Sequence, residues 1–495
     1  MTTGHLRPGG VVRATGTVRA DGTVLTTSTV APVTAHPVGA MAHRAAVERL
    51  RASYRAVPTG QTVRLAKRTS NLFRPRTVVT APGLDVTGLT DVISIDAAGR
   101  TADVQGMCTY ERLVAATLAH GLMPKVVPQL RTITLGGAVT GLGIESSSFR
   151  NGLPHESVRE LDILTGDGRV VTATPDGEHA ALFAAFPNSY GTLGYATRLR
   201  IDLDPVQPYV VTRNVHFGSL EDLTEAIGEI VTHRTWQDEP VDFLDGVLFA
   251  GSPPSTEAYL VLGRWSDDAH LATRLSDYTG QRVYYQSLQR RPTDALTVHD
   301  YLWRWDTDWF WCSKAFGAQH PTLRRLWPAA WRRSDVYHRI VGLENRYHVA
   351  AAIDARRGLP ARERVVQDVE IPLDRTADFL RWYLDHVPMT PVWLCPLVGR
   401  GTWSLYPLTP GQIYVNVGFW GTVPIAPGQR DGDVNRLVEQ AVGDHGGHKS
   451  LYSDAYYDEA DFWARYGGAG YATVKDRYDP DRRLPDLFTK VVRRA

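Results

Sequence analysis

The spacing of apolar residues predicts that regular structure begins near residue 40. In residues 40–54 the apolar positions Met41, Ala45, Val47 and Leu50 recur at helical intervals, with charged residues between them. A Pro-Thr-Gly run follows and predicts the end of this helix. The first element is therefore expected to be an amphipathic helix that covers a core with one face.

The next elements are predicted to be mainly strands. Residues 91–95 and 101–105 each have the pattern of a strand, and the short connection between them makes the pair a hairpin. A helix is expected from residue 109. A second hairpin is predicted from 158–164 and 169–174, because the TGDG sequence between them supplies glycines that adopt positive φ at low cost. This order predicts an α+β fold.

The pattern starts again after Pro205. A helix is predicted near 220–234, with strands at 242–249 and 258–263. The chain has 495 residues and exceeds the length at which a single hydrophobic core stops growing, so two domains are expected. We divide it into a flexible N-terminal lead, a first α+β domain, a second α+β domain and a mainly helical C-terminal segment: residues 1–39, 40–205, 206–435 and 436–495.

Composition and charge exclude several classes of function. The net charge of +1 gives no overall attraction to nucleic acid, so no nucleic-acid partner is expected. Cys108, Cys312 and Cys395 have no CxxC spacing, so neither a metal site nor a disulfide framework is predicted. A reducing, cytoplasmic setting fits this cysteine usage. The sequence shows neither a signal-peptide pattern nor an apolar run long enough to span a membrane.

The most informative segment is residues 128–152, which read PQLRTITLGGAVTGLGIESSSFRNG. Its glycines leave backbone N–H groups unobstructed, as a loop that approaches a phosphate requires. Its small hydroxyl side chains can bind phosphate or polyol oxygens; they are Thr132, Thr134, Ser146, Ser147 and Ser148. The spacing matches neither GxGxxG nor GxxxxGK[ST], the two common nucleotide motifs. From these residues alone, a set of tight turns is the other interpretation.

This segment resembles the flavin-binding loop of the vanillyl-alcohol oxidase and p-cresol methylhydroxylase (PCMH) superfamily. The closest resemblance is to the Δ24-sterol reductases, a group that includes bacterial methylene-fatty-acyl reductases. The match consists of the TxGG element at 134–137 and GLGIESSS at 141–148. Further matching elements are GTLG at 191–194, VVQD at 365–368, WLCP at 393–396 and LYSD at 451–454. The resemblance extends from about residue 45 to the C-terminus, apart from a variable middle.

The resemblance implies a fold and a cofactor. It implies a two-subdomain PCMH-type FAD-binding domain at 40–205, an α+β substrate (cap) domain at 206–435, and a C-terminal helical segment that closes on the FAD domain. The residues it implies for FAD binding are Lys67, Arg68, Ser70, Asn71, Gln129, Thr132, Thr134, Leu135, Gly136, Gly137, Gly141, Gly143, Ile144, Glu145, Ser146, Ser147, Gly191 and Gly194. For the run at 67–71 a solvated charged turn is the alternative. Because residues 60–76 contain no histidine or cysteine, we expect non-covalent FAD.

The resemblance also implies an activity. We expect an FAD-dependent oxidoreductase that reduces a C=C bond in a long apolar lipid, with NADPH as electron donor. The lipid is expected to be a methylene-branched fatty acyl chain or a sterol side chain, and a lipid methyltransferase stays open as a protein partner. An FAD-dependent alcohol oxidase or dehydrogenase is the alternative function. A non-catalytic flavin- or lipid-binding protein is the second alternative.

Reduction of an isolated C=C bond needs a proton donor as well as a hydride. Three groups of polar residues among apolar neighbours are candidates. Asp368 lies in a strand pattern, where an exposed carboxylate is the alternative. Tyr452 and Asp454 together suggest a proton relay, although a tyrosine packed in the core is the more common arrangement. For the third group, a structural salt-bridge network is favoured over catalysis; its members are His299, Arg304 and Asp306.

Six of the 13 tryptophans lie close together in the second half of the chain, and arginine pairs lie between them. They are Trp303, Trp305, Trp309, Trp311, Trp327 and Trp331, with Arg324–Arg325 and Arg332–Arg333. This composition is typical of a peripheral surface that meets anionic lipid. A lid packed over the flavin cleft is the other interpretation. The hypothesis is a cytoplasmic protein with peripheral contact at the inner membrane face.

Overall fold

The computed structural model describes residues 17–18, 24–25, 37–67, 83–249, 257–337, 339–340, 356 and 358–492. Residues 1–34 form a unit of their own, in which β1 (Thr17–Val18) pairs with β2 (Val24–Leu25) in antiparallel fashion. All other elements belong to the unit 35–495. No helix in the described part of the chain combines the length and hydropathy needed to cross a bilayer.

The predicted first helix is confirmed as α1 (Gly39–Arg55). Its buried residues are His43, Ala46, Leu50 and Tyr54, which follow one another at intervals of three and four positions. This spacing places them on one helical face, as the amphipathic pattern predicts. The face packs on Leu84, Leu89 and their neighbours in a small core of its own.

The first sheet is antiparallel, with strand order β3-β4-β8-β6-β7 and β5 paired to β8. Its strands are β3 (Val92–Asp96), β4 (Thr101–Gln105), β5 (Leu122–Pro124), β6 (Val158–Leu164), β7 (Val170–Ala173) and β8 (Tyr195–Pro205). Its helices are α2 (Tyr110–Leu118), α3 (Leu135–Gly141), α4 (Ser148–Asn151), η1 (Pro154–Ser157) and α5 (Ala180–Ala185). Both predicted hairpins are confirmed by the pairing of β3 with β4 and of β6 with β7.

The glycine-rich segment differs from the predicted loop, because its centre is the short helix α3. The Thr134 hydroxyl oxygen caps this helix by accepting a hydrogen bond from the Gly137 N–H at 3.2 Å. Gly136 packs against the preceding chain, and a Cβ there would lie 2.6 Å from the Gly106 carbonyl oxygen. At this position glycine therefore serves backbone packing.

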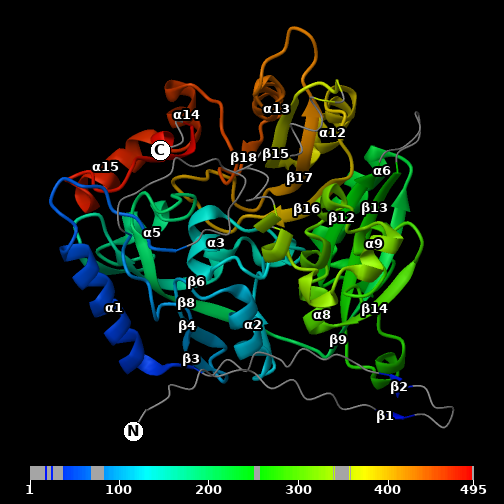
Figure 1. Ribbon diagram of the computed structural model, residues 1–495, viewed down its shortest axis with the longest axis horizontal. Helices are drawn as coiled ribbons and strands as arrows, with labels where there is room; N and C mark the ends of the chain where they lie inside the picture. Colours follow the sequence, from blue (N-terminus) through cyan, green and yellow to red (C-terminus); the bar gives the residue numbers. More distant parts are fainter. Residues whose placement is uncertain are drawn as a thin grey trace. The chain divides into compact units, whose positions relative to one another are not determined.

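The second sheet is also antiparallel, with strand order β14-β9-β13-β12-β16-β17-β15-β18. Its strands are β9 (Tyr209–Phe217), β12 (Phe243–Phe249), β13 (Glu257–Ser266), β14 (Thr293–Thr297), β15 (Arg362–Pro372), β16 (Val392–Val398), β17 (Ile413–Pro424) and β18 (His448–Lys449). Between α6 and β12 in the chain, the short strands β10 (Thr235–Trp236) and β11 (Glu239–Pro240) form a separate antiparallel pair. Mixed helices and antiparallel sheets agree with the predicted α+β class (Figure 1).

Three helices cover one face of the second sheet, namely α6 (Leu220–His233), α12 (Leu373–His386) and α13 (Asp433–Asp444) (Figure 1). Alternate residues of the strands face this layer, as the twofold repeat of a strand requires. The intervening residues, such as Val366, Trp393 and Trp420, join the core shared with the first sheet. The second face of this sheet is therefore the one that can build a site with the first sheet.

Short helices connect β13 to β15. They are η2 (Ala269–Thr273), α7 (Tyr284–Ser287), α8 (Val298–Leu302), η3 (Asp306–Asp308), η4 (Cys312–Phe316), α9 (Pro321–Leu326) and η5 (Ala329–Trp331). A buried ion cluster anchors this segment between the sheets. Arg304 Nη2 lies 3.2 Å from Glu145 Oε1 and 2.9 Å from Asp245 Oδ2. Arg304 therefore belongs to a salt-bridge network. This is the structural role that the sequence analysis favoured over catalysis for this residue.

The other two members of that candidate group lie apart from Arg304. His299 is exposed beside Asp300, and Asp306 is buried, where it accepts hydrogen bonds from Arg131. Asp306 also pairs with Ser334. None of the three lines the cavity described below.

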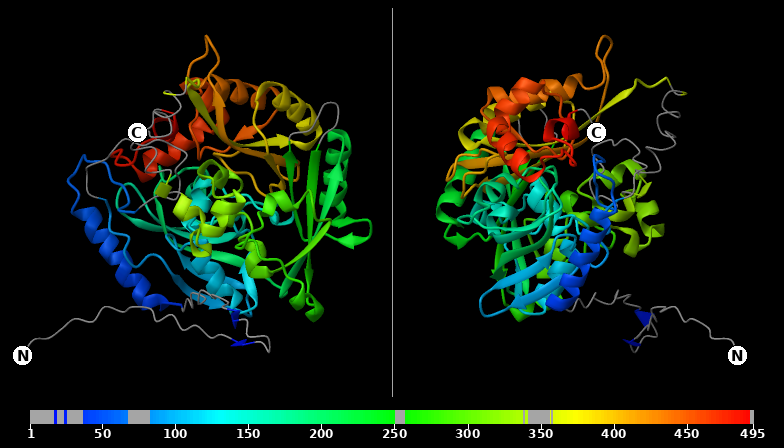
Figure 2. Two further views of the ribbon diagram at one scale, coloured as in Figure 1. Left: turned by 45° about the vertical axis from the view of Figure 1, so that its right-hand side comes forward. Right: turned by 90° about the vertical axis from the view of Figure 1, so that its left-hand side faces the viewer.

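The C-terminal segment contains α14 (Glu459–Arg465), α15 (Gly468–Tyr478) and α16 (Leu487–Val491), and it returns to the side of the first sheet (Figure 2). The buried Lys475 ammonium donates to the Thr192 carbonyl at 2.6 Å and to the Leu484 carbonyl at 2.9 Å. The Arg483 guanidinium lies 4.5 Å from the centre of the Tyr54 ring of α1. These contacts join the end of the chain to the GTLG element and to the first helix.

Candidate functional site

A cavity of about 600 Å³ lies where the first sheet, the tryptophan segment, the second sheet and the C-terminal segment meet. Its lining runs along the chain from Thr62 to Lys490. One wall comes from the glycine-rich segment, and the opposite wall comes from β15, β16, β17 and the turn after η3. The cavity therefore has two chemically different sides.

The first wall contains many of the residues that the sequence assigned to FAD. Those that line it are Lys67, Gln129, Thr134, Gly136, Gly137, Gly141, Gly143, Ile144, Gly191 and Gly194. Gly137 is exposed, so its backbone is open to a ligand in the cavity. Arg68, Ser70 and Asn71 lie outside the described residues.

Gln129 gives the clearest sign that this wall binds a polar ligand. Its side chain is 4 % exposed, and neither its amide nitrogen nor its amide oxygen has a hydrogen-bond partner among the described residues. A buried amide without partners is rare, because each unpaired polar atom loses the hydrogen bonds that it makes to water. A polar ligand in the cavity would satisfy it.

The remaining predicted FAD residues lie outside this lining, and they are Thr132, Leu135, Glu145, Ser146 and Ser147. The Ser147 hydroxyl donates to the Lys125 carbonyl at 2.8 Å. The Ser146 hydroxyl donates to Glu145 Oε1 at 2.6 Å and lies 3.1 Å from the Tyr301 hydroxyl. The hydroxyls of Ser146 and Ser147 hold the segment to its surroundings, and their assignment to FAD stays a prediction.

Three cationic side chains line the cavity near the first wall. They are Arg64, Lys67 and Lys490, and they come from both ends of the chain. Lys67 donates to the Thr134 hydroxyl at 3.2 Å, and Lys490 donates to the Tyr190 carbonyl at 2.5 Å. Such a group suits a diphosphate, which carries two negative charges or more at neutral pH. Sequence reasoning found Lys67 and missed Arg64 and Lys490, which stand outside any recognisable motif.

The opposite wall is aromatic. Trp309, Phe310, Trp393 and Trp420 line it, and the Phe310 ring lies 4.4 Å from that of Trp420 and 5.5 Å from that of Trp393. Trp393 stands in a matched element and Trp309 belongs to the group interpreted as a lid over the flavin cleft, whereas sequence reasoning did not place Phe310 or Trp420 at the site. Their side chains offer a long apolar ligand a closely packed surface.

The backbone at this wall is unusual. Trp309 and Phe310 have φ values of 45° and 57°, in the left-handed region that bulky residues rarely adopt. Leu142 and Tyr190, which also line the cavity, have φ values of 57° and 50°. Such conformations persist where the surrounding structure fixes them, and they are concentrated at functional sites.

Asp368 and Tyr452 both line the cavity, within the aromatic wall. The Tyr452 hydroxyl accepts a hydrogen bond from Trp420 Nε1 at 2.7 Å and donates one to the Asp368 carboxylate. Asn416 Nδ2 lies 3.4 Å from Asp368 Oδ1. Burial raises the pKa of Asp368 to about 7, although both hydrogen bonds oppose this shift. The carboxyl group is therefore partly protonated at neutral pH.

A second carboxyl group lies behind Asp368 on the same face of β15. Glu370 is fully buried and receives hydrogen bonds from the Tyr406 and Ser450 hydroxyls. Burial, with the Asp368 carboxyl adding to it, raises the pKa of Glu370 well above its usual value. Neither acid forms an ion pair with a residue that the structure describes.

Asp454, the third catalytic candidate, lies outside the cavity lining. Its carbonyl accepts a hydrogen bond from Lys449, which also pairs with Glu439. The structure thus brings Asp368 and Tyr452 together and separates Asp454 from them.

The cavity fits a flavin dinucleotide. Its first wall has a buried amide without partners at Gln129, an exposed backbone at Gly137, and the cations Lys67 and Lys490. The aromatic wall encloses the rest of the cavity, which we call the aromatic chamber. These features of the lining suit an organic cofactor that carries a diphosphate. Among the described residues no group of three histidine, cysteine or acidic side chains is arranged to hold a metal.

Comparison with known proteins gives the same cofactor. Residues 45–174 match the model of an FAD binding domain. The chain is 25% identical over 426 residues to the Delta(24)-sterol reductase of Homo sapiens, which covers 82% of this chain and 77% of that protein. It is 25% identical over 448 residues to the Delta(24)-sterol reductase of Arabidopsis thaliana, covering 80% of this chain and 74% of that protein.

A shorter match is to Cytokinin dehydrogenase 10 of Oryza sativa subsp. japonica, 29% identical over 181 residues. It covers 37% of this chain and 32% of that protein. Together with the residues of the first wall, these similarities agree with the resemblance found in the sequence. The chain is therefore an FAD-dependent oxidoreductase with a PCMH-type FAD-binding domain, similar along most of its length to the Delta(24)-sterol reductases.

Proposed function

We propose that the protein reduces a C=C bond in a long apolar lipid, with a reduced nicotinamide nucleotide, NADPH, as the source of electrons. A methylene-branched fatty acyl chain or a sterol side chain is the substrate class. The observation that carries the proposal is a carboxyl group, Asp368, set into the aromatic wall that faces the FAD-binding segment. The similarity to proteins named Delta(24)-sterol reductases supports the same reaction type.

The protein's residues divide the work of such a reaction. FAD, which Lys67, Gln129 and Gly137 would hold, would supply a hydride for one alkene carbon when bound. Trp309, Phe310 and Trp393 hold the apolar chain and exclude water. Asp368 gives its proton to the other alkene carbon, and its pKa of about 7 suits a general acid at neutral pH. The C=C bond becomes a saturated C–C bond, and water restores the proton to the carboxylate.

Tyr452 positions this acid. Its hydroxyl is held by Trp420 Nε1 and points its own hydrogen at Asp368. This chain of hydrogen bonds fixes the orientation of the carboxyl group beside the cavity. It also stabilises the carboxylate left behind after proton transfer.

Anaerobic spectroscopy of the purified flavoprotein tests the proposal. NADPH should bleach the flavin absorbance, and a methylene-branched phospholipid or a Δ24-sterol should restore it while the lipid gains two hydrogen atoms by mass spectrometry. Flavin that NADPH bleaches but neither alkene reoxidises would contradict the proposed reaction. Release of the flavin on acid precipitation would support non-covalent binding, and retention would contradict it.

A second candidate function is oxidation, which the similarity of 181 residues to a cytokinin dehydrogenase favours. An FAD-dependent alcohol oxidase or dehydrogenase would reduce its flavin with an alcohol in the absence of NADPH. Oxygen consumption or dye reduction with alcohol substrates separates this activity from alkene reduction.

A further inference from the structure

The segment from Lys314 to Ile340 is strongly basic in a chain that is almost neutral. It contains six basic residues, Lys314, Arg324, Arg325, Arg332, Arg333 and Arg339, and one acidic residue, Asp335. Its net charge is 6 − 1 = +5, whereas that of the whole chain is +1. Lys314, Arg325 and Arg339 are exposed. Arg324 and Arg332 are buried, and Arg324 pairs with Asp308, Arg333 with Glu111 and Arg339 with Asp335. The positive charge that the segment presents to solvent therefore comes from Lys314, Arg325 and Arg339.

The same segment presents apolar side chains to solvent. We call residues 321–331, which contain α9 and η5, the apolar knob. Leu326 is 77% exposed, Trp331 is 55% exposed and Leu323 is 49% exposed. Arg325 lies between the two leucines in sequence and is also exposed. Large apolar residues gathered on one short segment are uncommon on the surface of a soluble protein, and they mark a contact with another apolar phase.

The position of this surface differs from the one that composition predicts. Trp303, Trp305, Trp309 and Trp311 are all buried, and Trp309 lines the cavity, so these four pack as the lid interpretation expects. Of the other two tryptophans, Trp327 is half-buried and Trp331 is exposed. The exposed apolar side chains therefore follow the buried tryptophans in sequence.

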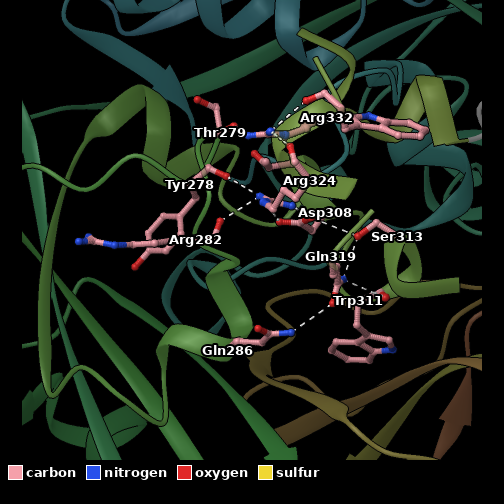
Figure 3. A network of polar contacts seen from close by, with 12 residues as sticks. Tyr278, Thr279, Arg282, Gln286, Asp308, Trp311, Ser313, Gln319, Arg324 and Arg332 are labelled. Carbon is pink, nitrogen blue, oxygen red and sulfur yellow. Dashed lines mark hydrogen bonds and ion pairs between the residues drawn. The ribbon is translucent and has the colours of Figure 1, made fainter. Parts of the chain in front are cut away.

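Two buried arginines hold the knob in place (Figure 3). The Arg324 guanidinium pairs with Asp308 and donates to the carbonyls of Tyr278 and Arg282 at 3.1 and 2.9 Å. Arg332 donates to the carbonyls of Thr279 and Trp327. Arg324 is 1% exposed and Arg332 is 5% exposed. These contacts fix both ends of the knob, so its leucines and Trp331 are presented on a rigid base.

The base of the knob is connected to the cavity. Asp308, which binds Arg324, also accepts a hydrogen bond from the Ser313 hydroxyl at 3.1 Å. Ser313 in turn accepts one from Gln319 Nε2 at 2.8 Å, and Gln319 donates to the Trp311 carbonyl (Figure 3). Trp311 directly follows Trp309 and Phe310, which line the aromatic wall. One network thus joins the exposed knob to the wall of the cavity.

We propose that the apolar knob docks on the surface of an anionic lipid bilayer, so that a lipid enters the aromatic chamber directly from the membrane. Leu323, Leu326 and Trp331 enter the interfacial region, while Lys314, Arg325 and Arg339 contact anionic headgroups. The charge of the segment selects an anionic bilayer over an uncharged one. The inference rests on the proposed function only in taking the lipid that enters as the substrate. Binding of the knob to a bilayer can be measured without turnover.

Flotation with vesicles tests the contact. The full flavoprotein is mixed with vesicles of phosphatidylglycerol and phosphatidylcholine, or of phosphatidylcholine alone, at low and at high salt. Recruitment to the anionic vesicles is expected, with weaker recruitment at high salt because salt screens the arginines. Absence of recruitment at low salt, or equal recruitment to both compositions, would overturn the proposal.

Variants separate the knob from the rest of the surface. The double variant Leu326→Gln/Trp331→Gln should bind anionic vesicles at least about tenfold more weakly, and Arg325→Gln about fivefold more weakly. The matched control is Leu384→Gln/Leu437→Gln, which changes exposed leucines of α12 and α13 and should bind like the unmodified protein. Flavin content reports that each variant is folded. Equal binding by the knob variant and the control would overturn the proposal.

Alkene reduction and self-association of the knob variant are two further readouts of the docking proposal. An alkene presented as a detergent-dispersed monomer should be reduced equally well by the knob variant, whereas an alkene in anionic vesicles should be reduced more slowly. A protein that binds vesicles but reduces neither form would refute the proposed function and leave the docking intact. If the knob variant instead loses self-association in analytical ultracentrifugation without any change in flotation, the knob is a protein contact and the docking proposal fails.

Discussion

Two pairs of carboxyl groups in this protein have opposite surroundings; Glu145, Asp245 and Glu370 are buried, and Asp368 is half-buried where it lines the cavity. Glu145 and Asp245 share the guanidinium of Arg304, and the indole N–H groups of Trp305 and Trp393 also donate to Asp245. Asp368 and Glu370 receive only hydrogen bonds from neutral groups in the described part of the chain. The first pair has a counterion, and the second pair has none.

This difference separates a structural role from a chemical one. Burial raises the pKa of Glu145, and the Arg304 guanidinium opposes this rise and holds two elements together. A buried carboxyl group without a counterion keeps its proton to a higher pH, so it can donate that proton. Arg304 thus joins the FAD-binding segment to β12, whereas Asp368 is left with a proton that a substrate in the cavity can receive.

The largest effect is expected where the counterion is removed. Arg304→Met leaves Glu145 and Asp245 buried without a cation, and breaking a buried ion pair in this way costs about 3–5 kcal/mol. The free energy of unfolding, measured by denaturant titration, should fall by that amount. Arg325→Met makes the same change at an exposed arginine and should alter stability by less than about 0.5 kcal/mol. Equal stability of the two variants would show that the first pair does not depend on its cation.

Removing the proton donor should affect catalysis and leave the cofactor in place. Asp368→Asn keeps the shape of the side chain but provides no acid, so reoxidation of reduced flavin by the lipid alkene should slow about 10²- to 10⁴-fold. Stopped-flow absorbance measures this rate, and the flavin content should stay unchanged. Glu370→Gln, on the same strand but outside the cavity lining, is the matched control. An equal loss in both variants would remove the distinction between the two acids.

The pH dependence of the same step should report the protonation of Asp368. Because the acid must be protonated and its pKa is about 7, the rate should be constant below pH 7. It should fall about tenfold for each pH unit above pH 7. Stopped-flow reoxidation between pH 5.5 and 9 gives this profile, and the residual rate of Asp368→Asn should lack the transition. A rate that rises with pH would assign Asp368 the role of a base.

A last effect, spread over several pH units, concerns stability and Glu370. Its pKa is raised in the folded protein, so its contribution to stability is complete below the pKa of the unfolded chain and is lost as pH rises toward the folded value. Each pH unit within that window should cost about 1.4 kcal/mol. Glu370→Gln cannot ionise, and its unfolding free energy should decline less between pH 5 and 9. Parallel pH profiles for the two proteins would contradict an uncompensated acid at this position.

The sequence predicted those parts of the molecule that depend on short segments. The helix α1, both hairpins and the FAD-binding segment are encoded by neighbours along the chain, through periodic apolar residues, turn glycines and a motif. Even there the helix α3 was missed, because its glycines argue against a helix while the Thr134 cap and the packing of Gly136 on Gly106 favour it.

The aromatic wall was largely beyond prediction, because its parts come together only by long-range packing. Trp309 and Phe310 meet Trp393 and Trp420 from two strands that follow much later in the chain. The positive φ of Trp309 and Phe310 has no signature in the residue types themselves. The arginines of the same region suggested lipid contact throughout, yet Arg324 is buried because its partners lie at Tyr278, Gly280 and Arg282.

The span of the cavity lining has a consequence for the biosynthesis of the flavoprotein. The lining of the cavity begins at Thr62 and includes Pro485 and Lys490, so almost the whole chain must be synthesised before the cavity can close. A ribosome that has released only the FAD-binding domain holds a site that lacks its aromatic wall and the lysine near Tyr190. Stable cofactor binding therefore requires an almost complete chain.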